Sequence, residues 1–203
     1  MSWTNVHGPG DKRMATRRAP LWKMDRTYLN TDRACQELRR GGIVMLRLAN
    51  GAACILQVAE LTGDGYREHL QRIAGSGALL VLTSSRLEAL SHALPSEFCG
   101  ASLPAHNLDN TGISHLAIDP PVSGLIGSST TLVRERRGSL ADYATRLLRI
   151  AKLLPAVMLA RLPSRDADKL QRICDEHNII LIQNRDIDSY MTAAAQSLRV
   201  AAR

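Results

Sequence analysis

Residues Gly77–Leu94, GALLVLTSSRLEALSHAL, carry the pattern that decides the fold of this chain. Ala78–Thr83 is a continuous apolar run with no polar face, which is typical of a strand covered by protein on both sides. Ser85 and Glu88 follow with the spacing of a capping box, in which each side chain satisfies a free backbone N–H at a helix start. A strand, a tight turn and an amphipathic helix in direct succession predict one unit of a layered α/β domain.

The same pattern of apolar runs and capped helices extends in both directions from this stretch. Upstream, we predict a helix from Thr31 or Asp32 to Gly41-Gly42. Two strands follow, over Ile43–Leu48 and Ala53–Val58, with a turn at Asn50-Gly51 between them. The next helix ends at Ala74, with Tyr66, Leu70 and Ile73 facing inward. Downstream, we predict a short strand over Ser114–Ile118 and a helix start near Ser128. A helix from Ser139 to Leu154 and a strand over Ala156–Leu162 follow. The chain then continues with a helix capped by Ser164 and ended by Asn178, a strand over Ile179–Ile182, and a last helix from near Asp186. Buried strands that alternate with capped helices, together with one antiparallel hairpin, predict an α/β/α sandwich with a mixed sheet.

Length and composition predict one domain with two tails. The 203 residues are 45% hydrophobic, which is enough to bury one substantial core. We expect a basic, flexible N-terminal arm over residues 1–30, an α/β domain over residues 31–192, and the end of the last helix or a tail over residues 193–203. No apolar run is long enough to cross a bilayer. The four cysteines are widely scattered, which favours reduced thiols in a cytoplasmic protein over a zinc site or a disulfide framework.

The formal charge of +7 raises the question of nucleic-acid binding. Aromatic residues make up only 3% of the chain, with a single Phe, so few side chains are available for stacking on bases. Part of the positive charge lies in residues 1–30. The composition therefore favours a basic surface and a solvated arm over a nucleic-acid-binding function, which stays as an alternative for the arm.

The order of elements resembles the 3,4-dihydroxy-2-butanone 4-phosphate synthases of riboflavin biosynthesis. The similar stretches are Ala34–Leu46, Gly77–Leu94, the segment ending in Ile118-Asp119, and Arg137–Ile182, and the similarity is one of pattern more than of identity. The resemblance implies an α/β sandwich that forms a homodimer, with each active site completed across the dimer. It also implies a magnesium-dependent rearrangement of ribulose 5-phosphate that releases formate.

The chain departs from this family at the positions that carry the chemistry. The family's Cys falls near Leu80, its Gly-His-Thr-Glu motif falls on Gly138–Ala141 with Ser139 in place of the His, and its later Glu falls on Arg161. The family's acidic stretch falls on the uncharged segment Leu48–Ala53. Magnesium requires oxygen ligands that converge on it, and an arginine repels the ion. We therefore expect no catalytic residue, no metal and no cofactor at these positions.

Two polar segments retain the residue types that bind a phosphate. The tetrapeptide containing Thr111 and Ser114 matches one that the family uses near its substrate. A second set, Ser128, Ser129, Thr130 and Thr131 with Arg134, offers hydroxyl and guanidinium donors. The alternative for both segments is an ordinary loop whose hydroxyls cap a helix.

The resemblance therefore implies a catalytically degenerate synthase-like domain with a structural and dimerisation role in riboflavin biosynthesis. In this family the domain often precedes a GTP cyclohydrolase II domain, which makes that domain a candidate partner. The alternative is an active lyase with a divergent site, which converts ribulose 5-phosphate to 3,4-dihydroxy-2-butanone 4-phosphate and formate and requires magnesium.

Overall fold

The computed structural model of the chain describes residues 26–201, apart from 62, 64, 123, 128 and 129. The expected arm therefore lies outside the described residues as far as residue 25. Ser128, where we expected a helix to start, and the neighbouring Ser129 also lie outside them. No helix in the described part of the chain is long and apolar enough to span a membrane.

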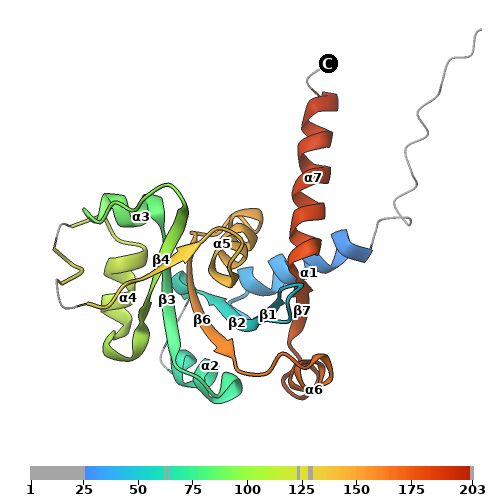
Figure 1. Cartoon of the computed structure of the whole chain (residues 1–203), viewed down its shortest axis with the longest axis horizontal. Helices are drawn as coiled ribbons and strands as arrows, with labels where there is room; N and C mark the ends of the chain where they lie inside the picture. The colour runs from blue at the N-terminus through green and yellow to red at the C-terminus, as the bar shows by residue number, and fades with distance from the viewer. Residues whose placement is uncertain (1–25, 62, 64, 123, 128–129, 202–203) are drawn as a thin grey trace, which may run out of the picture.

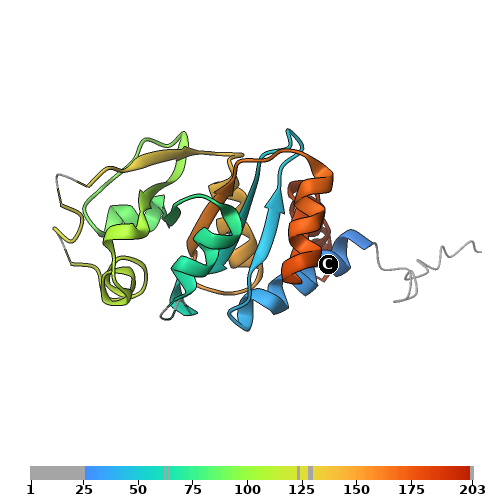
Figure 2. The same cartoon turned by 90° about the horizontal axis from the view of Figure 1, so that it is seen from below.

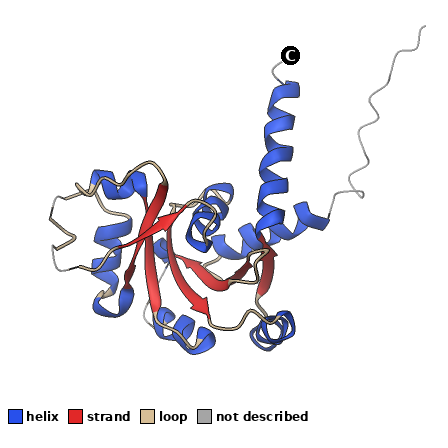
Figure 3. Cartoon of the chain, viewed as in Figure 1, coloured by secondary structure: helices blue, strands red, loops and turns tan. Residues whose placement is uncertain are grey.

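One mixed sheet of seven strands forms the centre of the molecule, in the order β5-β4-β3-β6-β2-β1-β7 (Figure 1 and Figure 3). The strands are β1 (Val44–Arg47), β2 (Ala53–Val58), β3 (Ala78–Thr83), β4 (Phe98–Pro104), β5 (Val133–Arg136), β6 (Ala156–Leu162) and β7 (Ile180–Gln183). β1 and β7 pair in parallel, and the other neighbours pair antiparallel. The expected mixed sheet is confirmed.

Helices cover both faces of this sheet. They are α1 (Arg26–Arg39), α2 (Tyr66–Ala74), α3 (Ser84–Ala89), α4 (Asn110–Ala117), α5 (Leu140–Ile150), α6 (Ala167–His177) and α7 (Asn184–Ala201), with short 3-10 helices at Ala59–Leu61 and Ala105–Asn107. Apolar residues of α1, α5 and α7 form one core layer with the sheet, on what we call the α5 face. Residues of α2, α3, α4 and α6 form a second layer on the opposite face, the α2 face (Figure 2). The fold is the expected α/β/α sandwich.

Several local signals hold as the sequence predicts. Gly51 adopts a φ of 84° in the turn between β1 and β2, where a positive φ favours glycine. Only Gly51 of the Asn50-Gly51 pair has a positive φ, so the turn is not the two-residue type in which both residues do. Ser139 caps α5 by accepting the N–H of Asp142, and Asn178 ends α6 in a left-handed conformation.

Three helix starts differ from the prediction. α6 begins at Ala167 and is capped by Asp166, whose side chain accepts the N–H of Asp168, so the expected cap at Ser164 is wrong. α1 begins at Arg26, five residues before Thr31, and the ring of Tyr28 stacks on that of Tyr190 in α7 with the ring centroids 4.6 Å apart. This contact between two helices is not visible in the local sequence. α3 is capped by Thr83, whose side chain accepts the N–H of Arg86, because the strand runs directly into the helix and leaves Ser85 inside it.

The segment between α3 and α5 differs most from the prediction. The expected strand over Ser114–Ile118 is wrong, because these residues belong to helix α4 and its end. Asp109 caps α4 by accepting the N–H of Gly112 at 2.7 Å. The strands β4 and β5 were not predicted. β4 approaches β3 so closely that a Cβ at Gly100 would overlap the carbonyl oxygen of Leu82.

Candidate functional site

A buried carboxylate lies on the α5 face of the sheet and binds two donors from other strands. Glu135 of β5 is only 4% exposed. Its Oε1 accepts a hydrogen bond from Ser102 Oγ at 2.7 Å and pairs with Arg161 Nη2 at 2.6 Å. We call Ser102, Glu135 and Arg161 the Glu135 cluster. Strands β4 and β3 lie between β5 and β6, so the two charged side chains meet across two strands of the sheet.

Cys54 lies next to this cluster and supplies no reactive thiolate. It pairs with Arg161 in the register of β2 and β6, so both side chains lie on the same face. Burial raises the pKa of the Cys54 thiol to about 12, although the nearby Arg161 opposes the shift. A neutral buried thiol acts as an apolar packing group.

The start of α5 holds a second polar group. Ser139 Oγ accepts the N–H of Asp142 at 3.3 Å, and the Asp142 carboxylate accepts the N–H of Gly138 at 2.8 Å. Arg146 Nη2 binds the same carboxylate at 2.6 Å. Ser139 therefore serves as a helix cap, and Oδ2 of Asp142 accepts from the Gly138 backbone and from Arg146 of the same helix.

The three positions transferred from the family do not converge. Arg161 points to the α5 face and Ser139 lies at the start of α5, but Leu80 is fully buried in the core layer of the α2 face. On β3 it is Val81 that belongs to the core layer of the α5 face. The structure thus brings Arg161 together with Glu135 and Ser102, and leaves Leu80 on the opposite side of the sheet.

The phosphate candidates come from separate elements. Thr111 and Ser114 lie on α4, and Ser114 Oγ donates to Asp119 Oδ1 at 3.4 Å. Thr130 and Thr131 lie in the segment before β5, whereas Arg134 is exposed on β5 with its guanidinium 5.6 Å from the ring centre of Phe98. No hydrogen bond or ion pair between described residues joins the α4 hydroxyls to Arg134.

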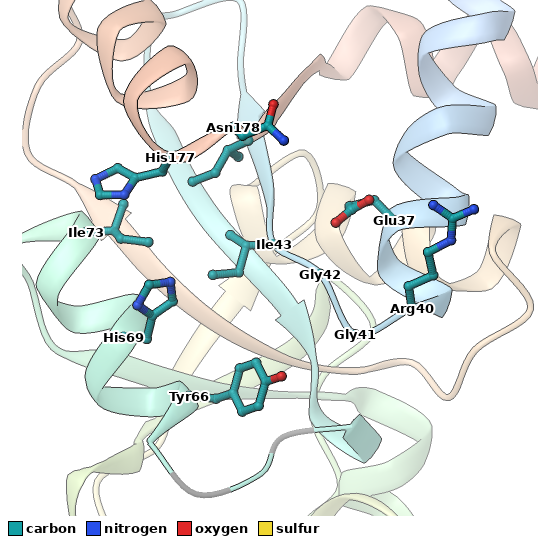
Figure 4. Close-up of a pocket in the computed structure, with 11 residues that line it drawn as sticks. Glu37, Arg40, Gly41, Gly42, Ile43, Tyr66, His69, Ile73, His177 and Asn178 are labelled. Atoms are coloured by element: carbon teal, nitrogen blue, oxygen red, sulfur yellow. The ribbon is translucent and has the colours of Figure 1, made fainter.

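A cavity of about 300 Å³ opens at another place, between the end of α1, the start of β1, α2 and the end of α6. Figure 4 shows Glu37 of α1 and Arg40 just after it on one side and His69 of α2 and His177 of α6 on the other, with Ile43 between them. Ile43 and Ile73 pack against the core layer of the α2 face. The cavity therefore has an apolar floor and polar walls.

The polar side chains of this cavity are available to a ligand. In the described part of the chain, no hydrogen bond or ion pair engages the side chains of Glu37, Arg40, Tyr66, His69 or His177. The Glu37 carboxylate lies directly against the backbone at Gly42, where an added Cβ would overlap its Oε1. No group of three or more His, Cys, Asp or Glu residues is arranged to hold a metal ion, as far as the described residues extend.

The cavity was not predicted from the sequence, for an identifiable reason. The apolar pattern placed Tyr66 on the buried face of α2 with Leu70 and Ile73, but Tyr66 is 41% exposed. Tyr66, His69 and Ile73 lie three or four residues apart on α2, so they share one face of the helix. A face that mixes an aromatic ring, an imidazole and an aliphatic side chain is the signal that could have identified a cavity wall.

Comparison with known proteins agrees with this fold. No profile of a known protein family matches the chain. The chain is 28% identical over 172 residues to a GTP cyclohydrolase-2 of Azospirillum brasilense, and the match covers 83% of this chain. The chain spans 44% of the length of that relative.

Solved structures of low sequence identity share the architecture. A two-domain 3,4-dihydroxy-2-butanone 4-phosphate synthase from A. baumannii superposes with a TM-score of 0.60 at 12% identity, covering 77% of this chain and 56% of that one. The synthase of Candida albicans gives 0.59 at 15% identity, covering 79% and 96%. A cation-free form of a synthase gives 0.61 at 12% identity, covering 80% and 96%. The chain therefore has the α/β fold of the 3,4-dihydroxy-2-butanone 4-phosphate synthases, the family that its sequence pattern resembles.

Proposed function

We propose that this chain is a catalytically degenerate 3,4-dihydroxy-2-butanone 4-phosphate synthase-like domain with a structural and dimerising role linked to riboflavin biosynthesis. One observation carries the proposal. Arg161 lies where the resembling family supplies a Glu, and its guanidinium binds the buried Glu135 at 2.6 Å. The Glu135 carboxylate is neutralised by a side chain of the same protein.

The chemistry of the available donors supports this proposal. A magnesium ion needs several hard oxygen ligands that converge on it. Glu135 is engaged by Arg161 and Ser102, and Asp142 is engaged by Gly138 and Arg146. The described residues of the α5 face thus present carboxylates that already have cationic or N–H partners, and this set does not fit magnesium.

The relationship to GTP cyclohydrolase-2 supports the proposed partner. The match covers less than half of the Azospirillum protein, so the larger part of that protein lies outside the aligned region. We propose that the domain dimerises and associates with a GTP cyclohydrolase II, and that it contributes assembly rather than chemistry. Sedimentation equilibrium tests the first point, and co-purification with a GTP cyclohydrolase II tests the second.

A formate assay tests the absence of lyase activity. The purified chain is incubated with ribulose 5-phosphate and magnesium, beside an active synthase as a positive control. We expect no formate above the level of a protein-free blank. Formate at an enzymatic rate would contradict the proposal and establish the alternative, an active lyase with a divergent site.

A further inference from the structure

The cavity between α1, α2 and α6 is separate from the Glu135 cluster. Its floor residues, Ile43 and Ile73, pack on the α2 face, whereas the cluster lies on the α5 face. Ligand binding in this cavity therefore does not depend on the proposed function. The formate assay tests neither whether a ligand binds here nor which ligand it is.

The α1 side of the cavity presents a carboxylate that lacks a donor. Glu37 is partly buried, and no described residue donates a hydrogen bond to its side chain. Its two oxygens accept up to four hydrogen bonds, and a partly desolvated carboxylate favours a ligand that supplies N–H groups. The absence of a side chain at Gly42 makes room for this carboxylate.

The opposite side presents cationic and N–H donors. His69 and His177 face the cavity from α2 and α6, and Figure 4 shows them across the cavity from Glu37. An adjoining hollow shares Tyr66 and His69 and adds Arg72. Imidazole and guanidinium groups suit an anionic group such as a phosphate.

We propose that this cavity binds a nucleoside monophosphate whose base presents two adjacent N–H donors, with the base edge on Glu37 and the phosphate toward His69, His177 and Arg72. The two oxygens of a carboxylate match two parallel N–H donors, as in other bidentate pairs. The apolar floor at Ile43 suits the flat ring between these ends, and a volume of about 300 Å³ is in the range of small-molecule sites.

Calorimetric titration of the full chain with GMP tests the proposal, because guanine carries this pair of donors and adenine does not. We expect saturable binding of GMP and binding of AMP that is about tenfold weaker or more. Glu37→Gln should weaken GMP binding about 10- to 100-fold, since a hydrogen bond to a charged acceptor is lost. Glu97→Gln removes the same charge from an exposed site away from the cavity and should leave GMP binding unchanged.

Two further variants keep the proposal testable if Glu37→Gln fails to fold. Gly42→Ala retains every charge but displaces the carboxylate, and should also weaken GMP binding. The double variant His69→Ala and His177→Ala should weaken GMP binding and leave guanosine, which lacks the phosphate, unaffected. The proposal is overturned if GMP does not saturate the protein at millimolar concentration, if AMP binds equally well, or if these variants bind GMP as the wild type does.

Discussion

Arg161 is the cationic partner of the buried Glu135 on the α5 face. Replacement by Met keeps much of its volume but leaves the Glu135 carboxylate, which is 4% exposed, with Ser102 as its remaining partner. Breaking a buried pair costs several kcal/mol, but the Arg161 side chain is 42% exposed, and solvent reduces this cost. We expect Arg161→Met to lower the free energy of unfolding by about 2 kcal/mol, measured by urea denaturation.

The double variant Arg161→Met and Glu135→Gln provides the control for this effect. Because Gln carries no charge, the double variant should be more stable than Arg161→Met alone. If it is equally unstable, the cost comes from packing and not from an uncompensated carboxylate.

The Cys54 thiol gives the stability of the protein a dependence on alkaline pH. Burial raises its pKa to about 12 in the folded state, from the ordinary value of 9.0 that the thiol has in an unfolded chain. Below the unfolded pKa both states keep the proton. Above it only the unfolded state releases the proton, so stability is lost as the pH rises toward the folded pKa.

We therefore expect the wild type to lose about 1.5 kcal/mol more stability than Cys54→Ala between about pH 8 and about pH 10. Burial also raises the pKa of Cys35, Cys99 and Cys174, but these thiols are present in both proteins and cancel in the comparison. Urea midpoints at the two pH values measure the difference. If the wild type and Cys54→Ala lose the same amount of stability, the Cys54 thiol has the same pKa in the folded and unfolded states.

The sequence predicted only part of the chemistry around these residues. The charge of Arg161 and its place on a buried strand were both visible. Its partner Glu135 was not, because the strand that carries Glu135 was not predicted. Leu80 was named because the Cys of the resembling family falls near it. An apolar run buried on both faces contains no signal that could have shown that Leu80 faces the other side of the sheet.

At the scale of elements, Arg86 of α3 fixes the end of α4. Its guanidinium donates to three carbonyl oxygens, those of Leu116 at 2.8 Å, His115 at 2.9 Å and Asp119 at 2.7 Å. No other described residue donates a hydrogen bond to these carbonyls at and just beyond the helix C-terminus, and a positive charge there also interacts favourably with the helix dipole.

We expect Arg86→Ala to lower the free energy of unfolding by about 2 kcal/mol and to reduce amide-exchange protection in α4. Arg33→Ala, an exposed arginine of α1, is the matched control and should change stability by less than about 0.5 kcal/mol. Unchanged exchange in α4 would mean that the three hydrogen bonds do not hold this helix.

Elements in the middle of the sheet could be predicted, and those toward one edge could not. β2, β3 and β6 have the predicted boundaries because each is a largely apolar run between clear turn signals. β5 exposes three of its four residues, which removes the apolar signal. The helix α4 was mistaken for a strand because its closing contacts come from Arg86, nearly thirty residues earlier in the chain.

At the scale of the whole molecule, the last strand and helix join the two ends of the described chain. β7 pairs in parallel with β1, and α7 then packs against α1 and α5. Tyr143 donates its hydroxyl hydrogen to Asp188 at 2.9 Å, and Arg146 lies 3.6 Å from the same carboxylate. The C-terminal half of α7 extends beyond the body in Figure 1, so the contacts of its first turns hold the helix in place.

The Tyr28–Tyr190 stack connects the first and last helices directly. Its removal tests whether this contact between α1 and α7 stabilises the entire fold. Tyr190→Ala removes the aromatic contact and buried ring area and should lower the free energy of unfolding by about 2 kcal/mol, in a single cooperative transition. Met191→Ala, at the next residue, which is 45% exposed, should cost less than about 1 kcal/mol. Urea denaturation followed by far-UV circular dichroism measures both variants. An early, separate loss of helical signal in Tyr190→Ala would contradict this expectation, because it would mean that α7 detaches while the remaining sandwich stays folded.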